Sequence, residues 1–268
     1  MRKIKELINL TDRTALITGG AGYLGRAFGE TLAELGANVA VADRNAAQAE
    51  QVAQTLTETY GIRAMAIVID MAVEADVRTL PSQVAEKLGS LDILVNNAAF
   101  VSSDGSLSGW SVPFAEQSSA TWREALEVNI TAPTFLTQAA WPFLKASGKG
   151  SVINITSLYA FLGPDLRLYE NTSMNNVAAY AASKGGLLQM TRWLSTVMAP
   201  EVRVNCVSPG GVWRSQPESF VKQFVSRTPL GRMAVEEDLK GVMAFLSSDM
   251  SQYVTGQHIP VDGGFSVW

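Results

Sequence analysis

The chain has 268 residues, 47% of them hydrophobic, so it can build one large α/β domain or two small ones. Its net charge of −4, without a run of five basic residues, argues against nucleic acid as a partner. Cys206 is the only cysteine and His258 the only histidine, which excludes an internal disulfide and a Cys- or His-rich metal site. We therefore expect no bound metal. No apolar stretch approaches ~20 residues, so we expect no membrane association and a cytoplasmic location.

Strand-like and helix-like segments alternate along the chain. Apolar runs typical of buried strands lie at 14–20, 38–44, 63–71, 91–99, 150–157, 202–211 and 257–264. Helical patterns lie between them at 23–36, 46–61, 74–89, 121–148, around Tyr180, and at 235–248. This alternation predicts a Rossmann-type α/β fold, a doubly wound parallel seven-stranded sheet with helices on both faces. No linker or internal repeat interrupts the pattern, so we expect residues 1–268 to form a single domain.

The segment TGGAGYLG, residues 18–25, lies between the first strand and the first helix of that pattern. Its glycines fit both G-x-G-x-x-G and G-x-x-G-x-x-G spacings, and such glycines allow a tight turn and a close backbone approach. The amides at the helix N-terminus would then hold a dinucleotide diphosphate. The predicted contacts are Gly19, Gly22, Tyr23, Leu24 and Gly25.

Asp43 ends the second strand, where an acidic side chain would bind the hydroxyls of the adenosine ribose. A carboxylate at this position repels the 2′-phosphate of NADP, so NAD is the favoured cofactor. Arg44 follows directly and offers a competing cation, and a plain helix N-terminal charge is the alternative role for Asp43.

Tyr180 and Lys184 lie one helical turn apart in AAYAASKGG, residues 178–186. A phenol with an ordinary pKa near ~10 needs a neighbouring cation to ionise at neutral pH. The pair therefore indicates either a shared helix face or a proton-transfer group.

Several separated motifs occur in the order found in one enzyme family. They are TGGAGYLG (18–25), NNAA (96–99), Asn129 in EVNIT, Ser157 in INITS, YAASK (180–184), SPGG (208–211) and VTGQHIPVDGG (254–264). With these motifs the sequence resembles a short-chain dehydrogenase/reductase from about Arg13 to the C-terminus.

The resemblance implies a catalytic role for four residues. Tyr180 would be the general acid/base for the substrate hydroxyl, and Ser157 would stabilise the substrate oxygen. Lys184 would bond the nicotinamide ribose and, with the positive nicotinamide, lower the pKa of Tyr180. Asn129 would hold a water that links Lys184 to solvent. The implied reaction is hydride transfer between the nicotinamide and a secondary alcohol or ketone.

Further cofactor contacts are implied by the same resemblance. Asp70, with Met71, would contact the adenine, and the backbone from Pro209 through Gly210 to Val212 would hold the carboxamide. Asn97 and Ala98 are expected contacts after the fourth strand. For Asn96 and Asn97 a structural role remains open.

The glycine loop departs from the family's usual Thr-Gly-x-x-x-Gly-x-Gly pattern, which would place glycine at position 23 instead of Tyr23. The glycine at position 22 is similar to that of a longer branch that modifies nucleotide sugars. The chain is too short for the substrate domain of that branch. The glycine spacing nevertheless gives one alternative function, a sugar epimerase or dehydratase that recycles bound NAD. A non-catalytic dinucleotide sensor is another alternative.

Two long segments, 100–120 and 158–179, would reach the nicotinamide end of the crevice. Their polar content, including Ser102, Asp104, Trp110 and Asn176, predicts a polar, sugar-type substrate, although packing against other subunits would also explain these loops. The pattern also resembles oxidoreductases that make unusual bacterial surface or flagellar amino sugars. The resemblance further implies a homotetramer or homodimer.

We expect residues from about 212 to 232 to form a lid over the substrate. Three arginines in or near these substrate-side segments are candidate ligands for a substrate phosphate: Arg167, Arg214 and Arg227.

Overall fold

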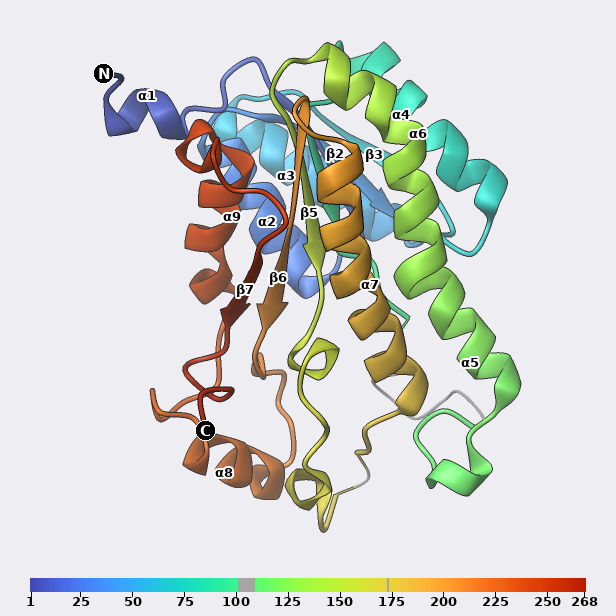
Figure 1. The fold of residues 1–268 in the computed structure, drawn as a ribbon. Coiled ribbons are helices and arrows are strands. Elements are labelled where there is room, and N and C mark those ends of the chain that lie inside the picture. The colour runs from blue at the N-terminus through green and yellow to red at the C-terminus, as the bar shows by residue number, and fades with distance from the viewer. Residues whose placement is uncertain (101–108, 173) are drawn as a thin grey trace.

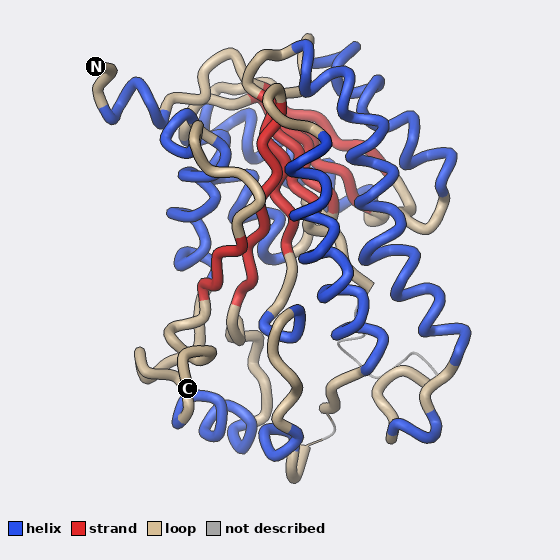
Figure 2. Tube along the Cα trace, in the orientation of Figure 1, coloured by secondary structure: helices blue, strands red, loops and turns tan. Residues whose placement is uncertain are grey.

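A computed structural model describes residues 1–100, 109–172 and 174–268, and a seven-stranded sheet runs through it (Figures 1 and 2). The strands are β1 (Thr14–Thr18), β2 (Asn38–Asp43), β3 (Ala64–Val68), β4 (Ile93–Asn96), β5 (Gly150–Ile155), β6 (Val202–Pro209) and β7 (His258–Val261). Their order is β3-β2-β1-β4-β5-β6-β7, and every neighbouring pair is parallel. The predicted seven-stranded α/β fold is confirmed.

Helices cover both faces of this sheet. The helices of the described residues are α1 (Ile4–Ile8), α2 (Tyr23–Glu34), α3 (Ala46–Tyr60), α4 (Glu74–Leu88), α5 (Ser119–Leu126), α6 (Ala132–Ala146), α7 (Ala178–Val197), α8 (Glu218–Ser226) and α9 (Lys240–Ser247). Apolar side chains of α2, α3 and α9 pack on one face, and those of α4, α6 and α7 pack on the other.

The strands divide their side chains between these two layers. In β1, Ile17 belongs to the core under α2, α3 and α9, whereas its neighbour Leu16 belongs to the core under α4, α6 and α7. In β2, Val41 and Ala42 divide in the same way. Alternate residues of a strand point to opposite faces, so a strand covered on both faces must be apolar throughout. This requirement explains why the strand segments read as continuous apolar runs.

All strands point toward one end of the molecule, where α8 and the C-terminus lie (Figure 1). Ligands of open parallel sheets bind beyond the carboxyl ends of the strands. The segments that follow β1, β2, β4, β5 and β6 meet at this end.

The segment predicted as one helix over 121–148 begins at Ser119 and contains a π-helical turn at Glu127–Thr131. Ser118 caps its N-terminus by accepting a hydrogen bond from the Ala120 amide at 3.1 Å. The spacing of apolar residues predicted the helix. It does not reveal the π-helical turn, which has no characteristic residue pattern.

Within the described ranges, no helix has both the length and the apolar character needed to cross a membrane.

Candidate functional site

The glycine loop after β1 depends on close backbone contacts. A Cβ atom on Gly25 would lie 2.1 Å from the carbonyl oxygen of Gly19, so no other residue fits there. Gly19 itself has φ +61°, and a Cβ on it would lie 2.9 Å from Cα of Ala98. These glycines let the start of α2 approach the turn and β4 closely. Gly22 is the N-cap of α2 and leaves the first-turn amides at the crevice.

Asp43, at the end of β2, is tied to the glycine loop. Its carboxylate accepts hydrogen bonds from the amides of Ala21 and Asn45, both at 3.0 Å. Helix α3 has its own cap, because the Asn45 side chain accepts from the Gln48 amide at 3.1 Å. Asp43 therefore lies beside the glycine loop and is not the residue that caps α3.

The residues after β3 and β4 differ in their exposure and in their hydrogen bonds. Asp70 is exposed and accepts a hydrogen bond from the Ala72 amide at 2.9 Å, whereas Met71 is buried in the core. The Asn97 side-chain amide donates to the carbonyls of Thr18 and Gly19, both at 3.0 Å, and so joins β4 to the glycine loop.

A buried polar chain crosses the neighbouring part of the sheet. The Asn96 amide donates to Asn154 Oδ1 at 2.8 Å and to Thr137 Oγ1 at 3.1 Å. The Asn154 amide donates to Thr191 Oγ1 at 2.9 Å. These bonds hold β4, β5, α6 and α7 in register behind the site.

Three of the predicted catalytic residues come together where β5 ends and α7 begins. Ser157 follows β5, and its side chain lies close enough to Tyr180 to act on the pKa of that phenol. Lys184, one turn along α7, lies with Nζ 5.9 Å from the centre of the Tyr180 ring. Its ammonium is buried and donates to the carbonyl of Ile155 at 2.9 Å. Tyr180 and Lys184 of the Tyr–Lys motif thus lie together next to the serine.

Burial dominates the electrostatics of this group. Burial raises the pKa of Tyr180, and the side chain of Ser157 only partly opposes that effect. Burial also lowers the pKa of Lys184 to about 8. The expectation that Lys184 and a positive nicotinamide together lower the Tyr180 pKa stays a prediction for the protein with its cofactor bound.

Asn129 lies in the π-helical turn and is fully buried. Its Oδ1 accepts from the Phe100 amide at 2.6 Å, and its Nδ2 donates to Ser183 Oγ at 3.0 Å. Ser183 donates in turn to the carbonyl of Tyr180 at 2.8 Å. These bonds occupy the Asn129 side chain and tie it to the helix that carries Tyr180.

Two further phenols lie beside Tyr180. The hydroxyls of Tyr159 and Tyr169 share a hydrogen bond of 2.5 Å, and the side chain of Asn176 acts to lower the pKa of both phenols. Burial is the largest cause that raises the pKa of each phenol, so both stay protonated donors. Neither tyrosine belongs to a motif that the sequence analysis singled out. The one available signal was that Tyr159 stands two residues after Ser157.

The segment around Tyr169 packs against α8. Tyr169 lies 5.5 Å from Phe220, ring centre to ring centre, and Phe224 stacks on Phe265 at 4.6 Å. An ion pair between Asp165 and Arg227 joins the same two segments. The insertion after Ser157 and the expected lid therefore form one aromatic cluster.

The three arginines proposed for phosphate binding all have carboxylate partners. Arg167 and Arg227 both pair with Asp165, and Arg214 pairs with Glu236 at 2.8 Å. The guanidinium of Arg167 together with the Arg227 charge lowers the pKa of Asp165 to about 2. A substrate phosphate would have to displace one of these carboxylates.

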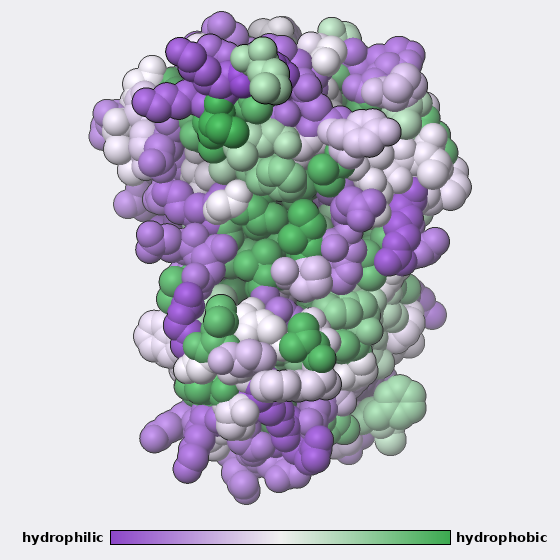
Figure 3. Space-filling model, turned by 60° about the vertical axis from the view of Figure 1, so that its left-hand side comes forward, coloured by the Kyte–Doolittle hydropathy of each residue, from purple (hydrophilic) through white to green (hydrophobic). Residues whose placement is uncertain are grey.

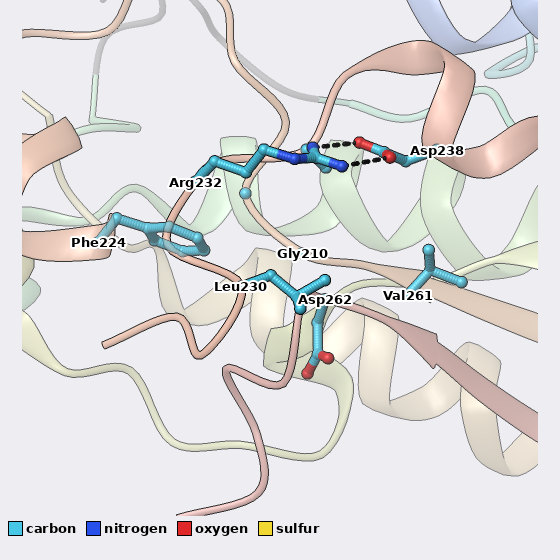
Figure 4. Close-up of a pocket in the computed structure, with 10 residues that line it drawn as sticks. Gly210, Phe224, Leu230, Arg232, Asp238, Val261 and Asp262 are labelled. Atoms are coloured by element: carbon cyan, nitrogen blue, oxygen red, sulfur yellow. Dashed lines mark hydrogen bonds and ion pairs between the residues drawn. The ribbon is translucent and has the colours of Figure 1, made fainter. Parts of the chain in front are cut away.

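The chain after β6 is fixed to its neighbours. The Gly210 amide donates to the Val261 carbonyl at 2.9 Å, and Val212 forms a parallel bridge with Ala234. A cavity of about 130 Å³ lies between this segment and α8, lined by Phe224 and Leu230 and bordered by the Arg232–Asp238 ion pair (Figure 4).

Part of the predicted substrate loop, including Ser102 and Asp104, lies outside the described residues. Trp110 is buried, and its ring meets that of Phe100 edge-on at 5.0 Å. It belongs to a small apolar core with Ala125 and Val177, and so does not face the crevice as was expected. Its apolar bulk gains more by burial than by exposure at a polar site.

Comparison with known proteins matches this arrangement to one family. A family model described as Enoyl-(Acyl carrier protein) reductase matches residues 20–266. A tropinone reductase homologue of Arabidopsis thaliana is 35% identical over 97% of this chain and 94% of its own length. The chain belongs to the short-chain dehydrogenase/reductase family. It is an NAD(P)-dependent oxidoreductase that acts on CH–OH groups.

Other short-chain dehydrogenases/reductases show the range of this similarity. Cis-4-hydroxycyclohexanecarboxylate dehydrogenase of Sinomonas cyclohexanicum is 32% identical, with 95% of this chain and 97% of that protein covered. A gluconate 5-dehydrogenase from Burkholderia cenocepacia, solved with NADP and tartrate, has a TM-score of 0.87 and 28% identity, with 99% of this chain and 100% of that chain covered. An NAD+-bound xylitol dehydrogenase has a TM-score of 0.84 and 26% identity, with 95% and 99% covered.

The residues of this short-chain dehydrogenase/reductase fit a nicotinamide dinucleotide. The Lys184 ammonium is only 2% exposed and has three donors, of which Ile155 takes one among the described residues. The open N-cap at Gly22 suits a diphosphate, and the Asp43 carboxylate suits ribose hydroxyls. Within the described part of the chain, no three His, Cys, Asp or Glu side chains are grouped as metal ligands would be.

Proposed function

We propose that this protein is an NAD-dependent oxidoreductase that transfers hydride between nicotinamide and a secondary alcohol or ketone of a polar, sugar-type substrate. The observation that carries the proposal is the grouping of Ser157, Tyr180 and the buried Lys184 where β5 ends and α7 begins. The bound cofactor supplies the hydride chemistry.

The protein's own groups position the substrate and move one proton. Ser157 holds the substrate oxygen while Tyr180 Oη takes the proton during alcohol oxidation and returns it during ketone reduction. Lys184 binds the nicotinamide ribose through its remaining donors. Its charge, added to that of the oxidised nicotinamide, opposes the effect of burial on Tyr180. Asn129 fixes α7 through Ser183 and would hold the water that links Lys184 to solvent.

The preference for NAD over NADP rests on Asp43. The carboxylate sits beside the glycine loop, where the adenosine ribose would lie, and a 2′-phosphate there would meet a negative charge. The remaining proposed contacts run along the same strand ends. They are Gly19, Gly22, Tyr23, Leu24 and Gly25 for the diphosphate, Asp70, Met71, Asn97 and Ala98 near the adenosine half, and Pro209, Gly210 and Val212 for the carboxamide.

A polar substrate is supported by the groups beside Tyr180. Only one of the two hydroxyl hydrogens is used in the hydrogen bond between Tyr159 and Tyr169. The other hydroxyl hydrogen is available to a substrate oxygen. Asn176 adds both donor and acceptor groups. Replacing Tyr159 with Phe would raise KM for a polyhydroxylated substrate several-fold without changing NADH affinity. The gluconate and xylitol dehydrogenases named above support the same class.

We also infer a homotetramer or homodimer. The edge strand β7 and helix α9 carry partly buried apolar side chains, among them Val242, Phe245 and Ile259. The side of the molecule on which they lie shows a band of apolar surface between hydrophilic regions (Figure 3). Measuring the mass in solution by light scattering would test this inference.

The decisive experiment is NADH formation from NAD by the purified protein across sugars, sugar acids, sugar phosphates, nucleotide sugars and simple alcohols, with Tyr180→Phe as the control. Turnover on one class that vanishes in the control would support the proposal. Product formation without net NADH would favour an epimerase or dehydratase that recycles its cofactor. Tight NADH binding without turnover on any class would favour a dinucleotide sensor.

A further inference from the structure

Tyr23 occupies the position where glycine would stand in the usual glycine loop, and its side chain is unusually placed. It is the first residue of α2 and is 70% exposed, although it lies next to the diphosphate site. The guanidinium carbon of Arg214 lies 4.4 Å from the centre of the Tyr23 ring, which is the geometry of a cation–π contact.

Arg214 is held in this position by its own surroundings. Its guanidinium pairs with Glu236 at 2.8 Å and donates to the Trp213 carbonyl at 2.6 Å. Its amide donates to Gln216 Oε1 at 2.6 Å, and Gln216 Nε2 donates to the Val212 carbonyl at 2.8 Å. The loop after β6 therefore presents the cation to Tyr23 from a fixed base. Because Glu236 already neutralises this charge, the geometry favours the aromatic contact over phosphate binding.

The contact joins opposite sides of the crevice. Tyr23 follows β1, whereas Arg214 follows β6, and strands β4 and β5 lie between these two in the sheet. Three strand spacings correspond to on the order of 14 Å. A dinucleotide that runs from the glycine loop to the segment after β6 must cross this gap. The stacked pair therefore spans the path of the cofactor.

We propose that Tyr23 and Arg214 form a latch that closes over the diphosphate of the bound dinucleotide and slows its release. The proposal rests on the function proposed above, because it requires a dinucleotide in the crevice. A cation–π contact at an exposed site is weak enough to open at every binding event. The latch joins the glycine loop to the segment that leads into α8, so cofactor retention and the position of α8 become coupled.

The test is the dissociation rate of NADH, followed by stopped-flow fluorescence in the absence of substrate. Tyr23→Leu and Arg214→Gln should each release NADH about 3- to 10-fold faster, and the double variant no faster than either single variant. Tyr23→Phe keeps the ring and should keep the slow rate. Tyr253→Leu and Arg192→Gln are matched controls, since Tyr253 is fully exposed and Arg192 lies on the outside of α7.

Unchanged release in Tyr23→Leu and Arg214→Gln would overturn the latch, as would two full-sized effects that add in the double variant. Loss of the slow rate in Tyr23→Phe would also overturn it, because that change leaves the aromatic face intact. If the wild-type protein binds no NADH, the proposed function and the latch both fail. If it binds NADH with a release rate that these variants do not alter, only the latch fails.

Discussion

The two halves of the crevice are built in different ways. The cofactor half consists of strand ends and backbone turns, such as the loop in which Gly25 lies directly against the carbonyl of Gly19. The substrate half consists of side chains from separate loops, such as the Asp165–Arg227 ion pair and the stacked rings of Phe224 and Phe265. The first half is rigid because its backbone admits no alternative, and the second can change while the fold stays intact.

The largest test acts where the two halves meet. Tyr180→Phe removes the proton-transfer group without altering the cofactor contacts, so turnover should fall by about 10³-fold or more. NADH affinity should stay within about twofold of the wild-type value. Steady-state kinetics measure the turnover, and a fluorescence titration measures the NADH affinity. Full activity in this variant would contradict the catalytic role of Tyr180.

A substitution in the glycine loop tests how rigid the cofactor half is. Gly25→Ala forces a Cβ against the Gly19 carbonyl, so the free energy of unfolding should fall by about 3 kcal/mol, and NADH binding should be lost. The matched control is Gly241→Ala on α9, where a Cβ meets nothing within 4 Å. That variant should be as stable as the wild type or slightly more stable. Equal behaviour of both variants in urea denaturation would contradict the rigid loop.

The buried lysine predicts a pH dependence of stability. The pKa of Lys184 is about 8 in the folded protein, below its ordinary value of 10.5. Between these pH values the unfolded chain binds a proton that the folded protein does not, so the free energy of unfolding rises with pH across this window. The gain reaches about 3 kcal/mol at most.

Lys184→Met should remove that rise. Denaturation of the cofactor-free proteins at pH 7.5 and 9.5 gives the comparison, and the wild type should gain stability relative to the variant at the higher pH. A relative loss at pH 9.5 would show that the lysine stays charged in the folded protein.

The cofactor preference is a smaller effect within the rigid half. NADH should bind more tightly than NADPH, and Asp43→Asn should narrow the difference about tenfold because the repelling charge is gone. The amide oxygen can still accept one of the two backbone hydrogen bonds that Asp43 now receives. Equal NADH and NADPH affinities in the wild type would remove the argument for NAD.

The smallest expected effect lies in the adaptable half. Arg227→Gln breaks the ion pair with Asp165 but leaves the aromatic contacts of α8 in place. KM for the substrate should rise about two- to threefold, with NADH affinity unchanged. A change in NADH affinity as large as the change in KM would mean that the two halves are not independent.

The same contrast decides what the sequence could predict. Strands, helices and the glycine loop follow from local patterns, and the spacing of Tyr180 and Lys184 places them on one face of α7. The Tyr159–Tyr169 contact and the stacking of Arg214 on Tyr23 join loops whose separation in sequence carries no periodicity. The raised pKa of Tyr180 also escaped prediction, since burial is set by the packing of the whole site.

The π-helical turn at Glu127–Thr131 is in effect one residue too many for a regular helix. Each residue of an α-helix turns the chain by about 100°, so deleting Val128 would restore regular winding but rotate everything before it by that angle. Either Asn129 would leave its contacts with Phe100 and Ser183, or α5 would swing away from α7. The helix therefore keeps an extra residue that its own stability does not require. The contacts of Asn129, in the middle of the helix, limit where insertions or deletions are tolerated along it.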